Sequence, residues 1–458
     1  MSELDADVLV VGAGGAGLAA ALAAAERGLS VLLAEGRENF RSECNTFMST
    51  AMIPAGGSRW QKTLGIEDSP ALFYDDIMRK TKGAAYAVVA KALTTVAPEL
   101  VAWLADRWEL PLALATDFDY PGHSRQRCHT VPDRSGETLH RLLVDAATAQ
   151  DNVTLAAPLA LRELAIRAAD RATAILVSPD GHEETVDIGA VVLAAGGFGG
   201  NTELVRRNIP EIANALYFGS PGNDGTAIRL GQTLGADLGY LDAYQGHGSV
   251  ATPTGIMVTW ASVMHGAVIL NAAGERFDDE TQGYSEYAEK VIAQPGSVAW
   301  LVLDERIDRL CRPFADYARL VEADAIRWHE DLAGVARQIG ADPAAVARTF
   351  ERAGTFADGA AGDLFGRRIW EAPLMPPMGV VKITGALFHT QGGLLVDERA
   401  HVLRHGEPIA NLFAAGGSAA GMSGHGAAGY LAGNGLLAAL GLGYLAGRAV
   451  ASVPAATM

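Results

Sequence analysis

The residues best suited to chemistry are a group of glycines that follow the first apolar segment of the chain. Residues 8–11 are typical of a buried strand, and an alanine- and leucine-rich segment typical of a helix follows the glycines. The glycines between these segments are Gly12, Gly14, Gly15 and Gly17. Such glycines permit a tight turn, close approach of the backbone to a pyrophosphate, and close packing of helix on strand. The pattern predicts a dinucleotide site in which the N-terminus of the helix faces the phosphates.

A carboxylate follows at the distance that a dinucleotide site requires. A second apolar strand is predicted over residues 30–34 and ends at Glu35, about 20 residues beyond the glycines. We expect Glu35 to accept hydrogen bonds from ribose hydroxyls. Glycine-rich turns also occur without a ligand, but here strand, glycines, helix, second strand and acid come in the expected order.

The loop over residues 41–57 is rich in small and hydroxylated residues. It suits close packing against a flat ring, and an ordinary surface loop is the alternative. Its candidate polar contacts are Asn45, Thr46, Ser49 and Thr50. A further apolar strand over residues 190–195 ends in Gly196 and Gly197, and we expect it to meet the nucleotide from the other side.

The elements that position these residues predict two domains. Composition changes between residues 242 and 389, where glycine-rich strands give way to segments rich in His, Tyr, Trp, Arg and acids. Nucleotide-domain character then returns in the segment that ends at Gly417 and in a long Gly/Ala/Leu helix that ends near Val450. We therefore expect a nucleotide domain of residues 1–241 and 390–458, interrupted by a substrate domain of residues 242–389. Chemistry is expected between the two domains.

Apolar spacing predicts the main helices of both domains. Helical patterns cover residues 69–110, 137–149, 304–321 and 343–353. Short strands are predicted over residues 153–156, 174–177 and 185–188, with a hairpin turn at Asp180-Gly181.

Composition excludes several classes of protein. A formal charge of −17 over 458 residues argues against nucleic-acid binding. The three cysteines, Cys44, Cys128 and Cys311, form neither a disulfide framework nor a metal motif. We expect reduced thiols, no bound metal and a cytoplasmic protein. The uncharged run over residues 426–447 is long enough to cross a membrane, but its glycines and Asn434 favour an internal buried helix.

Taken in order, these motifs resemble the FAD-dependent fumarate reductases and 3-ketosteroid dehydrogenases. The similar segments cover almost the whole chain: the glycines at 12–17, Asn45-Thr46, Asp68-Ser-Pro-Ala-Leu, Ala194-Ala-Gly-Gly-Phe, Gly274-Glu-Arg-Phe, His389-Thr-Gln-Gly-Gly-Leu, Leu412-Phe-Ala-Ala-Gly and Gly433-Asn434. The resemblance implies FAD as the cofactor, with Asn434 among its contacts. It also implies an α/β, Rossmann-like FAD-binding domain interrupted by an α+β capping domain.

The fumarate-reducing members bind a dicarboxylate through two histidines and an arginine, and a second arginine donates a proton. By resemblance, His247 and His389 match the two histidines, and Arg276 matches the proton donor. Tyr430 stands where the clamping arginine is expected. A phenol does not replace a bidentate guanidinium, so this departure argues against fumarate as the substrate.

The steroid-type members imply a different set of residues. Tyr284 resembles the tyrosine that takes a proton, while Tyr430 and the Gly433 N–H resemble the groups that polarise the ketone. This set implies α,β-dehydrogenation of a cyclic ketone, with hydride transfer to FAD and Arg276 assisting the proton carrier. An external electron acceptor or donor completes the cycle. We also expect a helix that begins near Gly433 to direct its positive end at the flavin.

Alternatives remain open at this stage. The tyrosines also fit aromatic walls of a cleft, and Arg276 also fits a structural ion pair with Asp278, Asp279 or Glu280. The chain also fits a reductase of an unsaturated carboxylate with Arg276 as the acid, or a flavin-bearing electron-transfer protein without an active site. Six other histidines belong to no motif and are interpreted as ordinary residues: His123, His129, His140, His182, His265 and His329.

Overall fold

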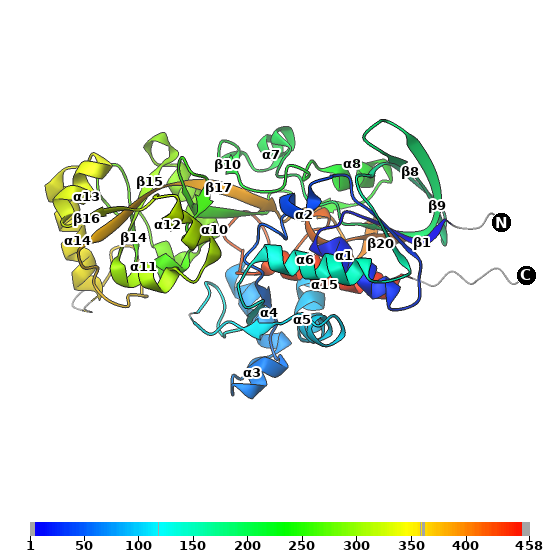
Figure 1. The fold of residues 1–458 in the computed structure, drawn as a ribbon, viewed down its shortest axis with the longest axis horizontal. Helices are drawn as coiled ribbons and strands as arrows, with labels where there is room; N and C mark the ends of the chain where they lie inside the picture. The colour runs from blue at the N-terminus through cyan, green and yellow to red at the C-terminus, as the bar shows by residue number, and fades with distance from the viewer. Residues whose placement is uncertain (1–4, 118, 358, 360–361, 451–458) are drawn as a thin grey trace, which may run out of the picture. The chain divides into compact units, whose positions relative to one another are not determined.

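The computed structural model describes residues 5–117, 119–357, 359 and 362–450, and the chain divides into two compact units (Figure 1). Unit 1 comprises Met1–Ile209, Gly219–Tyr244 and His389–Met458, and unit 2 comprises Pro210–Phe218 and Gln245–Phe388. These boundaries differ from the predicted ones in three places. Residues 242–244 and His389 lie in unit 1, and residues 210–218 lie in unit 2 because their short strand pairs with a long strand there.

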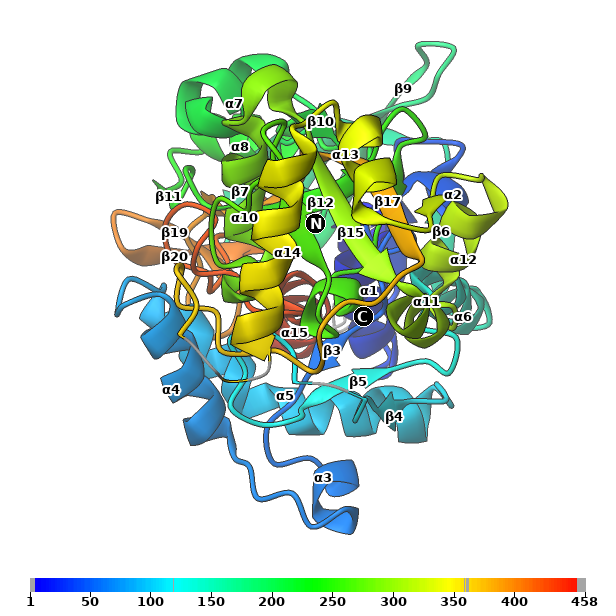
Figure 2. The same cartoon turned by 90° about the vertical axis from the view of Figure 1, so that its left-hand side faces the viewer.

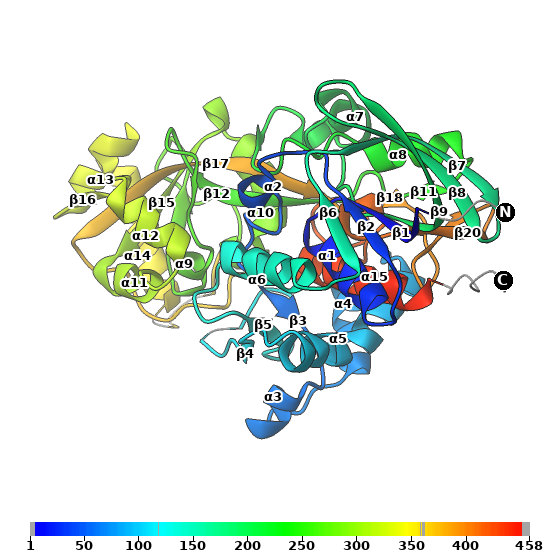
Figure 3. The same cartoon turned by 45° about the vertical axis from the view of Figure 1, so that its right-hand side comes forward.

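Unit 1 is built on an eight-stranded mixed sheet (Figure 3). Its strands are β1 (Ala6–Val11), β2 (Val31–Ala34), β6 (Val153–Ala156), β7 (Ala160–Ala168), β8 (Arg171–Val177), β9 (Glu183–Leu193), β19 (His401–Arg404) and β20 (Glu407–Ala414). The strands β20, β9, β1, β2 and β6 are adjacent in this order and parallel. The predicted strands over residues 185–188 and 190–195 are one continuous strand, β9.

The helices of unit 1 are α1 (Gly15–Ala25), α2 (Phe40–Glu43), α3 (Arg59–Thr63), α4 (Pro70–Lys80), α5 (Ala87–Arg107), α6 (Gly136–Thr148), α7 (Thr202–Asn208), α8 (Thr226–Thr233) and α15 (Asn434–Ala449). Of these, α1, α6 and α15 pack against strands of the large sheet and enclose the main apolar core of unit 1. Every residue of α1 is buried, and α1, α6 and α15 run side by side in Figures 1 and 3. A Cβ added at Gly443 would lie 2.2 Å from the Ala16 carbonyl oxygen. Small residues therefore let α1 and α15 approach each other closely.

Smaller elements complete unit 1. A three-stranded antiparallel sheet contains β3 (Ile53–Pro54), β5 (Cys128–Thr130) and β4 (Ala113–Leu114), and a two-stranded one contains β11 (Leu238–Gly239) and β18 (Gly393–Leu394). A 3₁₀ turn, η4 (Gly416–Ser418), follows β20.

In unit 1, one predicted helix is divided in the structure and another is shorter than predicted. The pattern over residues 69–110 is two helices, α4 and α5, rather than one. Among the helices in the described ranges, α5 alone is long and apolar enough to cross a membrane, and its Val89, Leu93 and Leu100 are buried as in a core helix. The uncharged run over residues 426–447 becomes helical only at Asn434.

Unit 2 is an α+β arrangement around a seven-stranded sheet (Figure 2). Its strands are β10 (Leu216–Tyr217), β12 (Tyr244–Ala251), β13 (Ile256–Met257), β14 (Val268–Leu270), β15 (Ala299–Asp304), β16 (Arg327–His329) and β17 (Met378–Thr390). Its helices are α9 (Ala261–Met264), α10 (Tyr284–Ile292), α11 (Glu305–Cys311), α12 (Ala315–Glu322), α13 (Leu332–Ile339) and α14 (Pro343–Ala357), with the 3₁₀ turns η1 (Pro210–Ile212), η2 (Glu280–Gln282) and η3 (Pro295–Ser297).

The core of unit 2 forms where helices pack on this sheet. Val335 and Ile339 of α13 and Val346 of α14 pack against Val302 of β15 and Val380 of β17. The predicted helical stretch over residues 304–321 is two helices, α11 and α12, because the chain is not helical between Cys311 and Ala315.

Candidate functional site

The glycine turn between β1 and α1 has a distinct reason for each glycine. Gly12 has φ +104°, and a Cβ there would lie 2.5 Å from the Ala194 carbonyl oxygen. A Cβ at Gly17 would lie 1.8 Å from the Gly12 carbonyl oxygen. Gly14 is the N-cap of α1, and the nearest atom to a Cβ there is Thr46 Oγ1 at 3.9 Å. Packing therefore requires Gly12 and Gly17, whereas Gly14 gives a ligand room to approach the backbone.

Glu35 lies against this turn. Its carboxylate accepts hydrogen bonds from the backbone N–H groups of Ala13 and Arg37, each at 2.8 Å. A carboxylate has about four lone-pair sites, so two remain for further donors. The role of Glu35 toward a ribose stays a prediction.

Hydrogen bonds join the loop over residues 41–57 to the same turn. This arrangement argues against the alternative of an ordinary surface loop. Thr46 Oγ1 accepts a hydrogen bond from the Gly15 N–H at 2.9 Å, and Ser49 Oγ donates to the Thr46 carbonyl at 2.7 Å. The Gly15 N–H, predicted as a cofactor contact, is thus bonded within the protein. His140, which carried no signal in the sequence, is buried and bonds the Ala13 carbonyl at 2.8 Å.

Three other predicted cofactor contacts hold the protein together around this loop. Asn45 Oδ1 accepts hydrogen bonds from the Ser220 N–H and from Asn223 Nδ2. A Cβ at Gly196, whose φ is +76°, would lie 2.0 Å from Asn223 Oδ1. Thr50 contributes its carbonyl to a hydrogen bond from Thr130.

Gly197 and Gly417 mark a close approach between the ends of β9 and β20. A Cβ at Gly417 would lie 2.6 Å from Gly197 N, and one at Gly197 would lie 2.1 Å from Thr390 Oγ1. That hydroxyl accepts the Phe198 N–H at 3.1 Å. Contact within the protein is thus sufficient to explain these two glycines. The predicted contact of Gly197 with the nucleotide stays a prediction, as does a cofactor contact at Gly417, which ends a segment of nucleotide-domain character.

The predicted helix start near Gly433 is confirmed. Gly433 has φ +82° and is the N-cap of α15, and a Cβ there would lie 2.6 Å from Pro54 Cδ. Asn434, the first helical residue, is fully buried and donates from Nδ2 to Ser423 Oγ at 3.2 Å. Its Oδ1 has no hydrogen-bond partner among the described residues. A buried acceptor at a helix N-terminus fits a polar edge of a bound group.

His389 and Tyr430 lie together beside the first turn of α15. Their ring centroids are 5.8 Å apart, in an edge arrangement. A Cβ at Gly435 would lie 2.7 Å from His389 Nε2, so this nitrogen faces the helix. The Gly435 N–H donates to the Tyr430 hydroxyl at 3.3 Å. Burial lowers the pKa of His389 to about 4, so the imidazole is neutral at pH 7.

His247 and Tyr284 lie together in unit 2. The His247 ring stacks on Tyr284 and on Phe388, with centroids 5.0 Å apart in both pairs, and it meets Trp260 at 90°. Its Nδ1 accepts the Ser249 N–H at 3.3 Å. Burial lowers the pKa of His247 to about 3, so this imidazole is also neutral.

Arg276 is held in a buried ionic cluster in unit 2. Its guanidinium forms a bidentate pair with Glu280, at 2.8 and 2.6 Å, and bonds Asp363 at 2.5 Å. Arg367 also bonds Glu280, at 3.2 Å, and all four side chains are at most 4% exposed. Burial alone would lower the pKa of Arg276, but the hydrogen bonds and charges of Glu280 and Asp363 raise it. This arrangement supports the structural ion pair left open by the sequence, with Glu280 as the near partner.

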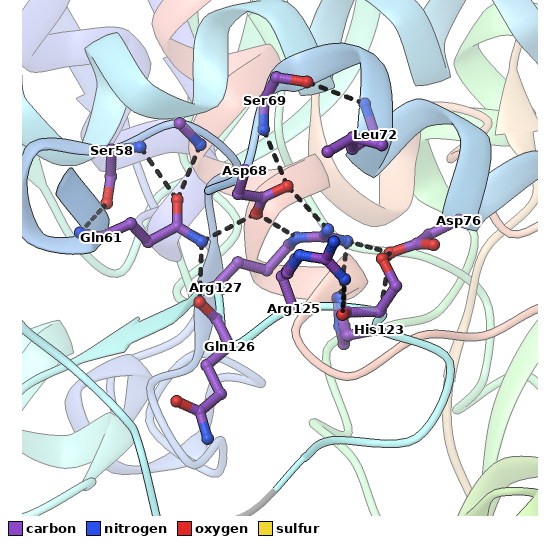
Figure 4. Close-up of polar contacts among 12 residues, drawn as sticks. Ser58, Gln61, Asp68, Ser69, Leu72, Asp76, His123, Arg125, Gln126 and Arg127 are labelled. Atoms are coloured by element: carbon purple, nitrogen blue, oxygen red, sulfur yellow. Dashed lines mark hydrogen bonds and ion pairs between the residues drawn. The ribbon is translucent and has the colours of Figure 1, made fainter. Parts of the chain in front are cut away.

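A third buried arginine, Arg127, lies in unit 1 (Figure 4). Arg127 bonds Asp68 at 2.8 and 3.0 Å and Asp76 at 2.5 Å, and none of these side chains is more than 2% exposed. Arg127 also approaches His123 Nδ1 at 3.4 Å, and His123 Nε2 bonds the Ala432 carbonyl at 2.9 Å. No sequence motif identified His123, because the residue that it bonds, Ala432, lies 309 positions away in the chain.

Comparison with known proteins decides the family. A family model described as an FAD binding domain matches residues 7–436. The chain belongs to this FAD-binding family. It is a flavoprotein oxidoreductase whose relatives include fumarate reductases, and it shares its fold with 3-ketosteroid dehydrogenases, so the predicted resemblance, fold class and cofactor are confirmed.

Relatives in this FAD-binding family have several activities. The NADH:fumarate oxidoreductase of Klebsiella pneumoniae (strain 342) is 27% identical over 423 residues, which are 91% of this chain and 45% of that protein. The fumarate reductase (cytochrome) of Shewanella frigidimarina is 27% identical over 466 residues, covering 97% of this chain and 77% of that one. This chain thus spans less than half of the length of the Klebsiella pneumoniae protein.

Solved structures agree on the fold. The open conformation of a flavocytochrome c3 fumarate reductase superposes with a TM-score of 0.78 at 25% identity, covering 97% of this chain and 78% of that one. The 3-ketosteroid-Δ4-(5α)-dehydrogenase of Rhodococcus jostii RHA1 gives 0.75 at 23% identity, covering 99% and 98%.

The described residues fit FAD. Gly14 leaves the backbone at the N-terminus of α1 uncrowded, and Asn434 Oδ1 is a buried acceptor that needs a donor. Glu35 retains acceptor capacity beside the same turn. We therefore expect Gly14, Glu35 and Asn434 to contact the cofactor, and that assignment stays a prediction.

Proposed function

We propose that this protein dehydrogenates a cyclic ketone between the carbons α and β to its carbonyl. In this reaction the β-carbon loses a hydride and the α-carbon loses a proton, so that a carbon–carbon double bond forms. Bound FAD supplies the two-electron chemistry by accepting the hydride. An external acceptor then removes the electrons, and the substrate is a small neutral molecule.

The observation that carries the proposal is the neutral character of the groups that contact His389. In the described parts of the chain, every hydrogen bond and ring contact of His389 is with an uncharged group. An uncharged donor set suits a carbonyl oxygen, which develops negative charge only as the α-proton leaves. A carboxylate is charged from the start and is better bound by an arginine fork. We assign to Tyr430 and the Gly433 N–H the stabilisation of that developing charge.

We assign to Tyr284 the removal of the α-proton from the substrate. It is the first residue of α10, and stacking on His247 fixes the plane of its ring. A positioned phenol can exchange a proton with the substrate as a general acid–base group. His247, neutral and stacked, supports the ring and offers its remaining nitrogen to the substrate.

The alternative is reduction of an unsaturated carboxylate, with Arg276 as the proton donor. The names of the relatives favour it, because they include fumarate reductases and the urocanate reductase of Eggerthella lenta. The ion pairs of Arg276 argue against it, because two carboxylates stabilise its charged form and raise its pKa. We therefore assign Arg276 to the support of unit 2.

Anaerobic mixing tests the proposal. The FAD-loaded enzyme is mixed with a panel of cyclic ketones and saturated acids, and bleaching of the flavin absorbance is followed together with the product. We expect a ketone to bleach the flavin and to yield one equivalent of unsaturated ketone per FAD. Bleaching by acids only, or oxidation of the reduced enzyme by fumarate only, would favour the alternative.

A further inference from the structure

A chain of three hydrogen bonds links the start of α15 to His389 through side chains distant in sequence. Asn434 Nδ2 donates to Ser423 Oγ at 3.2 Å, Ser423 Oγ donates to Gln391 Oε1 at 2.9 Å, and Gln391 Nε2 lies 3.1 Å from His389 Nδ1. Gln391, Ser423 and Asn434 are at most 5% exposed. Water therefore does not readily replace any of these partners.

The donor and acceptor atoms of these groups give the series of hydrogen bonds one direction from donor to acceptor. In this structure Ser423 Oγ donates its single proton to Gln391 Oε1, which places the amide nitrogen of Gln391 against His389 Nδ1. An amide nitrogen has only protons to offer, so Nδ1 must present a lone pair. The ring proton of neutral His389 is then on Nε2. The Thr390 carbonyl is the other neighbour of Nδ1, at 3.4 Å, and it would favour the opposite tautomer.

We propose that Gln391 is a positioning residue that fixes His389 as the Nε2–H tautomer and thereby selects substrates with a neutral acceptor oxygen. Nε2 faces Gly435 beside the Tyr430 ring. In this tautomer His389 presents a proton there, as a ketone oxygen requires. In the opposite tautomer it would present a lone pair and repel that oxygen.

The tautomer claim is independent of the reaction, whereas the selectivity claim rests on the proposed function. The same three hydrogen bonds connect the expected cofactor site with His389, because Asn434 carries the unpartnered Oδ1 that we expect to contact the cofactor. A donor held by the cofactor at Oδ1 would keep Nδ2 directed at Ser423. Binding of FAD would then reinforce the direction of the whole chain.

Nitrogen NMR of histidine tests the tautomer directly. The FAD-loaded enzyme is labelled with [¹⁵N]histidine, and long-range ¹⁵N–¹H spectra distinguish protonated from unprotonated ring nitrogens. With 11 histidines in the chain, loss of one signal in a His389→Asn variant assigns the residue. We expect the Nε2–H tautomer in the wild type. The Nδ1–H tautomer there would overturn the proposal.

Two variants test Gln391 as the cause. Gln391→Met removes the donor and leaves the Thr390 carbonyl as the neighbour of Nδ1, and Gln391→Glu offers an acceptor in its place. Both should move the proton to Nδ1, whereas Gln232→Met, at an exposed position of α8, should not. If Gln391→Glu does not fold, Gln391→Met alone decides. Retention of Nε2–H in the folded variant would overturn the proposal.

Ligand binding tests the selectivity claim. Cyclohex-2-en-1-one is the neutral probe and cyclohexanecarboxylate is the charged one, and the flavin absorbance reports binding. Gln391→Met should weaken the ketone about ten-fold, the effect of losing one hydrogen bond, and leave the acid within about two-fold. A changed tautomer with unchanged ketone affinity would overturn the selectivity claim. Failure of every ketone to bleach the wild type would instead overturn the proposed function, because the tautomer measurement uses no substrate.

Discussion

Unit 1 and unit 2 each contain one candidate histidine and one candidate tyrosine, but they fix these side chains by different means. In unit 1, hydrogen bonds hold His389 and Tyr430, and the bonds set which atom carries a proton. In unit 2, the rings of Tyr284 and Phe388 both stack on His247, whose Nδ1 also accepts the Ser249 N–H. Both histidines therefore have a bonded Nδ1, and the units differ in the aromatic stacking around His247. We assign the substrate oxygen to His389 and Tyr430 and the proton to Tyr284.

The largest expected effect comes from breaking the unit 2 side of this comparison. Tyr284→Phe should slow reductive bleaching by a ketone about 10²–10⁴-fold, the usual contribution of a general acid–base group. Binding should be nearly unchanged, because the ring remains stacked on His247.

Tyr287→Phe is the matched control for this variant. Tyr287 lies on the same helix, is buried, and has a hydroxyl without a hydrogen-bond partner in the described ranges. Rapid-mixing kinetics should find it close to wild type. Equal losses in both variants would contradict the assignment of the proton to Tyr284.

The next effect concerns stability. Arg276→Met should destabilise the protein by about 3–5 kcal/mol, because it leaves Glu280 and Asp363 buried without their shared partner. Arg319→Met, at an exposed ion pair with Asp316, should cost at most about 1 kcal/mol. Chemical denaturation monitored by circular dichroism measures both. A variant Arg276→Met with wild-type stability and no turnover would support Arg276 as the proton donor.

A smaller effect is expected at the cofactor. Glu35→Ala should weaken FAD binding by about 1.5–3 kcal/mol, the value of a charge-assisted hydrogen bond. Glu38→Ala, at an exposed position three residues later, should retain FAD. Fluorescence of FAD released during dialysis reports the difference, and equal retention by the two variants would remove Glu35 from the site.

A further effect is a dependence of stability on pH. Burial and the charge of Arg127 together lower the pKa of His123 to about 4, whereas unfolded histidine titrates at about 6.5. The unfolded chain therefore binds more protons in this window, and stability should fall as pH falls from about 6.5 to 4. Thermal unfolding should show a shallower fall for His123→Gln than for the wild type. His182→Gln, at an exposed position, should leave the slope unchanged.

Sequence reasoning succeeded where the signal is local and failed where partners are distant. The glycine turn before α1 and the start of α15 were predicted from local patterns and are present in the structure, whereas the role of Glu35 toward a ribose stays a prediction. Glu280, four residues from Arg276, was a candidate partner, but Asp363 lies 87 positions away and was not. The partner of His123 and the Ser423 member of the Gln391 chain are similarly remote. Spacing along the chain does not encode such contacts, although Gln391 stands only two residues after His389.

The central claim is that Tyr430 and His389 form an uncharged site for a carbonyl oxygen. The most direct measurement compares anaerobic flavin bleaching by a cyclic ketone with bleaching by the matching saturated carboxylic acid, in the wild type and in Tyr430→Arg. We predict that the wild type reacts with the ketone and not with the acid. We also predict that Tyr430→Arg loses about 10²-fold or more of the ketone rate, as expected for one oxyanion donor. A wild type that reacts faster with the acid, or a Tyr430→Arg variant that keeps the ketone rate, would contradict the account.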